Sequence, residues 1–268
     1  MAETEIFWAD CNNPKMMEAF KNAQKTFKYF WRELSWEYRR IVPGLTVACV
    51  KVAFSQDVEG QEEPLVEHMW INQVSFDGNN IAGILINSPH ELTNVSEGDA
   101  VSVPLTRISD WLFAIMDSKP KTGLSKLFSS TPKPKTYGGF TIQAMRSEMS
   151  DREREEHDKA WGLDFGNYHE VLLVHGQKET PENLIEHPMS RNMREKFVEF
   201  LNEYPDEITH ADENGLTFFH KETIAGNLTS IEILLSLGAD KSIQTKQGET
   251  ALDFAKKMNW EHIIPVLE

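Results

Sequence analysis

Two segments near the end of the 268-residue sequence match each other at a fixed offset. Residues 212–220 read Asp-Glu-Asn-Gly-Leu-Thr-Phe-Phe-His, and residues 246–253 read Lys-Gln-Gly-Glu-Thr-Ala-Leu-Asp. The matching positions share an offset of 33: Gly215 with Gly248, Thr217 with Thr250, and Gly226 with Asn259. Glycine and asparagine both tolerate the left-handed turn that ends a helix. A period of this length predicts helical hairpins that bury their apolar faces only by stacking on neighbours.

These segments resemble the ankyrin repeat. The resemblance rests on the Gly-x-Thr turns, His220, Gly226-Asn227, Leu234-Leu235 and Gly238-Ala239-Asp240. It covers residues 184–268, with one degenerate copy and two recognisable ones. The family's usual proline after threonine is replaced by Phe218 and Ala251. The resemblance implies an all-α domain that binds other proteins, in which His220 ties neighbouring turns together.

The degenerate copy lies one period earlier. Stepping back by the same offset leads from His220 to His187 and from Leu234 to Leu201. The segment 197–201 is then its second helix. Pro188 falls inside its first helix, where proline removes a hydrogen bond, so we expect that helix to be shortened or re-aimed.

The segment 1–180 has a different pattern. Apolar and aromatic residues recur at helical spacing from Pro14 to Tyr38, which predicts a long amphipathic helix that ends before Pro43-Gly44. Strand-like segments follow at 45–55, 68–76, 81–87 and 100–103, and Asp77-Gly78-Asn79-Asn80 is a hairpin turn. Residues 108–116 fit either a buried helix or a strand. The expected fold is therefore α+β, an antiparallel sheet with a long amphipathic helix, followed by the all-α repeats.

Residues 40–150 resemble the YegJ-like bacterial domain of unknown function (DUF2314). The residues that carry this resemblance are Glu67–Ile71, Gly83–Pro89, Gly98-Asp99, Ile108–Trp111 and Gly139–Thr141. Some members of that family also carry ankyrin repeats and a His-Pro-Met-Ser segment, which is residues 187–190 in this chain. The resemblance implies a compact α+β domain of bacterial origin and implies no particular reaction.

Composition narrows the class of protein. The formal net charge is −15 and the isoelectric point is about 5.1, so nucleic acid is disfavoured as a partner. The two cysteines, Cys11 and Cys49, cannot form a disulfide framework or a four-cysteine zinc site. The sequence has no apolar run long enough to span a bilayer, and its start lacks a signal-peptide pattern. We therefore expect a soluble, cytoplasmic protein without a cofactor.

Two connecting segments separate the predicted domains. Residues 118–147 contain only basic charges and several prolines, which predicts mostly loop. This loop either is exposed and offsets the negative charge of the chain, or contacts an acidic partner, a phosphate group or an anionic membrane face. The segment after Gly138-Gly139 is strand-like, so these glycines are not expected to form a phosphate-binding loop. Ser150 and Glu153 form a capping-box pattern at the start of a charged helix over 150–159. A short strand is expected at 171–174.

Three residues of the first domain are fallback candidates for acid–base catalysis: Glu67, His68 and Asp110. A carboxylate beside a histidine can hold the ring in one tautomer. Adjacent residues of a strand face opposite sides of the sheet, however, so Glu67 and His68 do not pair without a bulge. The alternative is structural: His68 and Trp70 fill one sheet face, and Asp110 caps a helix that begins at Trp111.

Trp70, Asn87 and Trp111 are candidates for a ligand pocket, although the sequence favours core positions for the two tryptophans. Glu153, Glu156 and His157 have helical spacing that suits one metal ion. A solvated, salt-bridged helix face explains them better, so no metal site is predicted.

The function that the sequence favours is a non-enzymatic protein-interaction module, formed by an α+β domain over 1–180 and repeats over 184–268. The expected partner-binding residues lie at the turns and on the first-helix faces: Asp212, Glu213, Asn214, Lys221, Glu222, Lys246, Gln247 and Glu249. Because so few repeats are marginally stable, we expect the first repeat to dock on the long helix or on residues 160–180. The alternative is an enzyme or small-ligand sensor with a pocket around Glu67, His68, Trp70 and Asp110.

Overall fold

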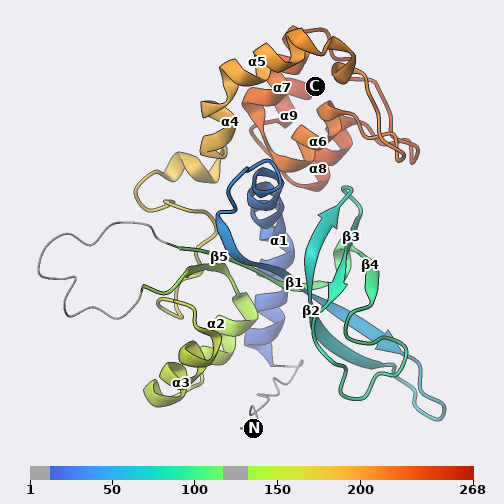
Figure 1. Ribbon diagram of the computed structural model, residues 1–268. Coiled ribbons are helices and arrows are strands. Elements are labelled where there is room, and N and C mark those ends of the chain that lie inside the picture. Colours follow the sequence, from blue (N-terminus) through green and yellow to red (C-terminus); the bar gives the residue numbers. More distant parts are fainter. Residues whose placement is uncertain (1–12, 117–131) are drawn as a thin grey trace, which may run out of the picture. The chain divides into compact units, whose positions relative to one another are not determined.

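A computed structural model describes residues 13–116 and 132–268 (Figure 1). The chain divides into two compact units. The first comprises the residues up to Phe27, 43–75 and 81–172; the second comprises 28–42, 76–80 and 173–268. The second unit therefore contains the whole segment 184–268 together with two pieces of earlier chain.

The described strands form a six-stranded sheet in the order β4-β3-β2-β1-β5-β6. The pairs β1–β2, β1–β5 and β5–β6 are antiparallel. The strand bounds are β1 Leu45–Gln56, β2 Leu65–Phe76, β3 Asn80–Leu85, β4 Ala100–Pro104, β5 Ile108–Ile115 and β6 Lys135–Gly138. The open choice for residues 108–116 is thus resolved as a strand, and β5 is buried along nearly its whole length. The hairpin turn is confirmed, because Asp77 N–H donates to the Asn80 carbonyl at 3.3 Å.

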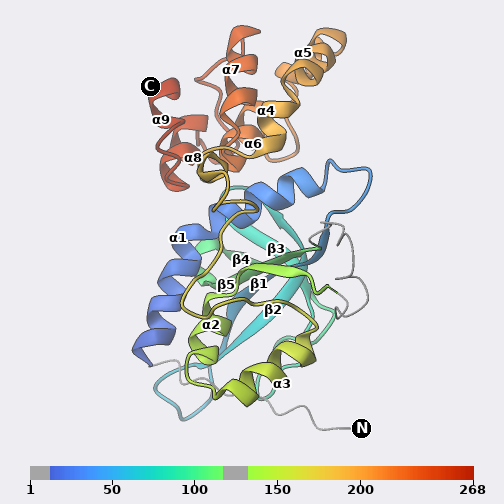
Figure 2. The same ribbon diagram turned by 90° about the vertical axis from the view of Figure 1, so that its left-hand side faces the viewer.

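The predicted long helix is confirmed as α1 (Pro14–Glu37). Its first half belongs to the first unit, where the Trp111 indole N–H donates to the Ala23 carbonyl at 3.1 Å. Figure 2 shows this helix running alongside the strands. The sheet is therefore covered by α1 on the face that carries Trp111.

The next residue of β5 points to the opposite face, since side chains alternate along a strand. Leu112 belongs to a buried cluster with Trp70 and Phe165, in which the residues are Cys49, Trp70, Leu112, Ala114, Ile142, Leu163 and Phe165. The helices near this part of the chain are α2 (Phe140–Arg146) and α3 (Asp151–Trp161). Ser150 and Glu153 form the predicted capping box at the start of α3.

Three expectations about residues 108–174 are wrong. Residues 140–146 are helical and not strand-like, because a buried carboxylate, described below, binds the N–H groups of the first turn. Asp110 does not cap a helix that begins at Trp111, because both residues lie within strand β5. Residues 171–174 form no strand: Leu173 and Val174 N–H donate to the Gln177 side chain, not to a neighbouring strand.

In the second unit, α6 contacts α7 and α8, α7 contacts α5, and α8 contacts α9. The bounds are α4 Pro188–Asn192, α5 Arg194–Glu203, α6 Phe218–Ala225, α7 Leu228–Ser236, α8 Ala251–Lys257 and α9 Ile264–Leu267. The predicted helix over 197–201 is confirmed as part of α5. The all-α ankyrin domain is not confirmed, since α4 and α9 span only five and four residues and the unit also includes residues 76–80 of the hairpin.

Pro188 is the first residue of α4, not an interior one. Proline is tolerated there because the first N–H groups of a helix have no partner within it. The predicted shortening is observed.

None of the helices in the described parts of the chain is both long and apolar enough to cross a membrane.

Candidate protein-interaction surface

Two consecutive turns of the second unit have the same local geometry. Gly215 and Gly248 have φ of 82° and 81°, in the left-handed region that favours glycine. Thr217 and Thr250 follow at the same distance along the chain and are the N-caps of α6 and α8. The turns are also bonded directly, since Lys246 N–H donates to the Asn214 carbonyl at 3.0 Å.

The left-handed residue that follows the first helix of each predicted repeat, α6 or α8, also recurs. Gly226 has φ of 75° and Asn259 has φ of 52°, as their spacing predicts. The Trp260 indole N–H then donates to the Ile224 carbonyl at 3.1 Å. Asn259 is one of two non-glycine residues with positive φ in the described segments, so this conformation marks a specific turn.

His220 connects the two turns. Its Nδ1 lies 3.0 Å from the Thr217 hydroxyl and accepts from the Thr217 N–H at 3.2 Å, and its Nε2 donates to the Ile243 carbonyl at 3.1 Å. Burial lowers the pKa of His220, against the opposing effect of the Ile243 hydrogen bond. A neutral ring with both nitrogens engaged has the structural role that the sequence predicts.

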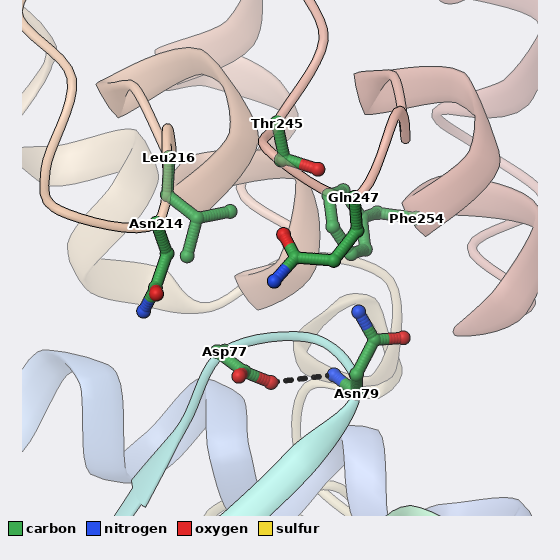
Figure 3. A pocket seen from close by; sticks show the side chains of 7 residues that line it. All are labelled: Asp77, Asn79, Asn214, Leu216, Thr245, Gln247 and Phe254. Atoms are coloured by element: carbon green, nitrogen blue, oxygen red, sulfur yellow. Dashed lines mark hydrogen bonds between the residues drawn. The ribbon is translucent and has the colours of Figure 1, made fainter.

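The β2–β3 hairpin turn reaches the tips of these turns (Figure 3). The Asn79 amide donates to Glu249 Oε2 at 2.5 Å, and the Lys257 ammonium contacts both Asn79 and Glu249. A shallow crevice lies between them, with no space wide enough for a water molecule. Its lining residues are Asp77, Asn79, Asn214, Leu216, Thr245, Gln247 and Phe254. The chain therefore fills this crevice with its own side chains.

The predicted partner-binding residues differ in how far they are exposed. Glu213, Lys246 and Gln247 are exposed at the tips. Asn214 and Glu249 are half-buried beside the hairpin, and Lys221 pairs with half-buried Asp212 at 2.9 Å.

The prediction that Glu222 binds a partner is wrong, because its side chain has no exposed surface. It accepts from Arg39 at 2.5 Å and from the Asn227 amide at 2.8 Å. Asn227 in turn accepts from the Trp36 indole N–H at 3.1 Å. Glu222 thus belongs to a buried polar network that the second half of α1 completes.

A second part of this network is centred on Glu33 of α1. His187 Nε2 donates to Glu33 at 3.0 Å, and Arg40 donates to the other carboxylate oxygen at 3.0 Å. Burial alone would raise the pKa of Glu33, but His187 and Arg40 together lower it. Burial lowers the pKa of His187, and its Nδ1 accepts the Met189 N–H at the start of α4. The neutral ring therefore both binds Glu33 and caps α4.

Arg32 is fully buried beside Glu33 on the same helix. Its guanidinium donates to the carbonyls of Asn183, Leu184 and Ile185. Burial lowers its pKa to about 10. The sequence pattern places Arg32 and Glu33 on the polar face of the helix, so their burial is not predictable from periodicity; partners from a distant part of the chain decide it.

The fallback catalytic residues each serve a separate structural contact. Glu67 accepts the backbone N–H groups of His90, Glu91 and Leu92 at 2.9, 2.6 and 2.8 Å. Burial opposes these bonds, yet they lower the pKa of Glu67. The structure thus uses Glu67 to anchor the loop after β3.

His68 lies 2.6 Å from the Ser109 hydroxyl, and its ring stacks on Phe20 of α1. Burial, with a contribution from Lys51, lowers its pKa to about 4. His68 and Trp70 lie on the same face of β2 by its register, but they make different contacts, His68 with Ser109 and Phe20 and Trp70 with Leu112.

Asp110 is fully buried and caps α2 from outside that helix. Oδ1 accepts the N–H groups of Trp111 and Phe140 at 2.8 and 2.9 Å, and Oδ2 accepts the N–H and hydroxyl of Thr141 at 2.8 and 2.6 Å. Burial raises its pKa against these bonds. The sequence suggests a capping role, but the capped helix begins at Phe140 and not at Trp111.

Trp70 and Trp111 do not face a common site, because their side chains point to opposite faces of the sheet. The Trp70 ring packs with Leu112, and the Trp70 backbone N–H donates to Asn87 Oδ1 at 2.8 Å. Trp111 points to the α1 face and is fully buried. The two rings lie on opposite faces because they follow the alternation of the strands.

The weaker candidates also have separate partners. Glu153 caps α3, Glu156 pairs with Arg152, and His157 pairs with Asp158 at 2.9 Å. Among residues 13–116 and 132–268, no three His, Cys, Asp or Glu side chains cluster as metal ligands would. Cys11 and residues 118–131 of the basic segment lie outside the described residues. Burial raises the pKa of the Cys49 thiol, which disfavours a reactive thiolate.

Comparisons with known proteins identify a family and two relatives. The family model described as "Uncharacterized protein conserved in bacteria (DUF2314)" matches residues 13–165. A protein of Neisseria meningitidis serogroup B (strain ATCC BAA-335 / MC58), named "Putative ankyrin repeat protein", is 45% identical over all 268 residues and 98% of its own length. The Escherichia coli (strain K12) protein named "Uncharacterized protein YegJ" is 27% identical over 90 residues, which are 34% of this chain and 48% of that protein. The chain therefore belongs to the DUF2314 family of proteins conserved in bacteria.

Proposed function

We propose that the chain is a protein-interaction module in which the helices after residue 184 form a short row of ankyrin repeats. The observation that carries this proposal is the recurrence, at one constant offset, of the same left-handed glycine, threonine N-cap and left-handed helix end. The name of the Neisseria relative, which matches over nearly its whole length, supports it. Each hairpin would bury its apolar face against the next.

The recognition surface in this proposal is the exposed part of the turn tips. Glu213, Lys246 and Gln247 are exposed on two consecutive turns. The first of these turns is held by its own hydrogen bonds, because Asp212 Oδ1 accepts the N–H groups of Asn214 and Leu216 at 2.9 and 3.0 Å. A turn held in this way loses little conformational entropy on binding. Since the row is short, the affinity of this surface alone is expected to be modest.

The test is affinity capture from a lysate of the source bacterium with the full chain as bait. The variant Glu213→Lys, Lys246→Glu keeps the net charge and reverses both tip charges. The matched control Glu155→Lys, Lys159→Glu makes the same exchange on exposed residues of α3. We expect a specific partner to be lost from the tip variant alone. Capture of the same partners by both variants contradicts the proposed surface.

A further inference from the structure

Helix α5 carries an apolar stripe that is only partly buried. Leu201 is 1% exposed, and α5 contacts α7. Phe197, Phe200 and Tyr204 follow at intervals of three and four positions, which places them on one stripe of the helix. Phe200 and Tyr204 are 36% and 52% exposed. The stripe is therefore covered at Leu201 and open at Phe200 and Tyr204.

The exposed rings form one cluster with the first residue of α6. Phe200 lies 5.4 Å from Tyr204 and 6.2 Å from Phe218, and Phe197 lies 6.3 Å from Phe218 between ring centroids. We name these four residues the α5 aromatic patch. Aromatic side chains of this kind anchor many protein interfaces.

The equivalent positions one period later are buried. Phe200 corresponds to Ile233, which is 3% exposed, and Phe218 corresponds to Ala251, which is 1% exposed. A position that is covered in the later helix is therefore open and aromatic in α5. The outer face of a terminal repeat is normally polar, because it contacts water. The α5 aromatic patch departs from that rule.

The surroundings of the patch are strongly acidic. The segment 194–207 contains five acidic residues and two basic ones, the acidic residues being Glu195, Glu199, Glu203, Asp206 and Glu207. The basic residues are already paired, Arg194 with Glu232 at 3.1 Å and Lys196 with Glu199 at 2.8 Å. We name these acidic residues the acidic rim. The acidic rim attracts a basic partner and repels a second copy of a chain whose net charge is −15.

We propose that the α5 aromatic patch is a docking site for a basic, apolar segment of another protein, whose apolar side chains cover Phe200 and Tyr204 and whose lysines or arginines face the acidic rim. Cationic side chains also bind favourably over exposed aromatic faces. This site is separate from the turn tips and rests on the proposed function only in treating the helices as a row with an open end.

The probe is a synthetic amphipathic peptide with leucine and tryptophan on one helical face and lysine on the other. Its binding to the full chain is measured by fluorescence anisotropy at low and moderate salt. We expect binding that weakens as salt increases. A peptide with glutamate in place of each lysine is expected not to bind.

Two pairs of variants locate the binding. Phe200→Ala, Tyr204→Ala removes the anchors, and Val66→Ala, Ile86→Ala removes other exposed apolar side chains. Glu203→Lys, Asp206→Lys reverses part of the rim, and Glu59→Lys, Glu62→Lys makes the same charge change on an exposed loop. Both patch variants are expected to weaken binding at least tenfold, with each control within about twofold of the unmodified chain. Circular dichroism checks that every variant folds.

Equal losses in the patch and control variants would mean general charge attraction and would overturn the proposal. Sedimentation of the free chain as a dimer that Phe200→Ala, Tyr204→Ala dissociates would identify a second copy as the occupant and would also overturn it. The turn-tip variant Glu213→Lys, Lys246→Glu is expected to bind the peptide normally. Failure of the tip surface and failure of this site are therefore measured independently.

Discussion

The Trp36 indole N–H donates to Asn227 Oδ1 at 3.1 Å, although the two residues are 191 positions apart. Both side chains are buried. This bond leads into the network of Glu222 and Arg39, so the polar groups between α6 and α7 depend on a helix from the other end of the sequence. The second half of α1 completes the packing of the later helices.

A fragment of residues 184–268 is expected to lack a cooperative thermal transition. Without Trp36, Arg39 and Glu33, the buried groups of Asn227, Glu222 and His187 lose their partners. Each such loss costs about 1–3 kcal/mol, a large part of the stability of a small domain. Circular dichroism melting of the fragment and the full chain measures this, and a sharp transition in the fragment would contradict it.

Arg39→Ala is expected to destabilise the chain by about 2 kcal/mol, because it leaves the buried Glu222 carboxylate without its cation. The double variant Arg39→Ala, Glu222→Gln is expected to recover at least half of that loss, since the buried charge is then removed. Urea unfolding of both variants decides. Additive losses would show that the ion pair does not couple the two residues.

Gly78→Ala and Gly98→Ala form a matched pair. Both glycines have φ above 90°, which costs a residue with a Cβ about 1 kcal/mol. A Cβ at Gly78 would also clash with the Phe254 ring, whereas nothing lies near a Cβ at Gly98. We expect the Gly78 variant to have a clearly lower free energy of unfolding than the Gly98 variant. Equal values would mean that the hairpin does not pack on α8.

Asp110→Ala is expected to cost about 3 kcal/mol, because it leaves the N–H groups of Trp111, Phe140 and Thr141 without their buried acceptor. Asp240→Ala removes an exposed carboxylate that bonds only Ser242 and is expected to cost about 1 kcal/mol at most. Urea unfolding compares the two. A similar small cost in both would indicate that α2 does not depend on its remote cap.

Stability is expected to fall as the pH drops below about 6.5. Burial lowers the folded-state pKa of His187 below its ordinary value of 6.5, so the unfolded chain binds more protons in this range. This contribution is complete above pH 6.5 and is lost as the pH falls through the folded pKa. Glu33 acts in the same direction at lower pH, below its ordinary value of 4.5.

The variant His187→Gln tests this assignment. It is expected to flatten the dependence of the unfolding free energy on pH between about 6.5 and 4.5, and the exposed control His210→Gln is expected to leave it unchanged. An unchanged slope in the His187 variant would transfer the effect to other buried histidines, such as His220 and His262, whose pKa values are also lowered by burial.

The sequence alone determined the local structure of this protein. The helical spacing from Pro14 onward, the Asp77–Asn80 turn and the period that relates Gly215 to Gly248 each predict an element that exists, because helix, strand and turn preferences act over short stretches of chain. The left-handed conformations of Gly226 and Asn259 are predictable for the same reason.

Only the tertiary structure decided which polar side chains are buried and what they bind. Arg32 and Glu33 have the spacing of a solvated face, yet both are buried against the segment 183–187. Asp110 caps a helix that begins at Phe140, and Glu222 is inside, not on the predicted surface. A buried charge is stable only with its partners in place, and those partners come together only when distant segments pack.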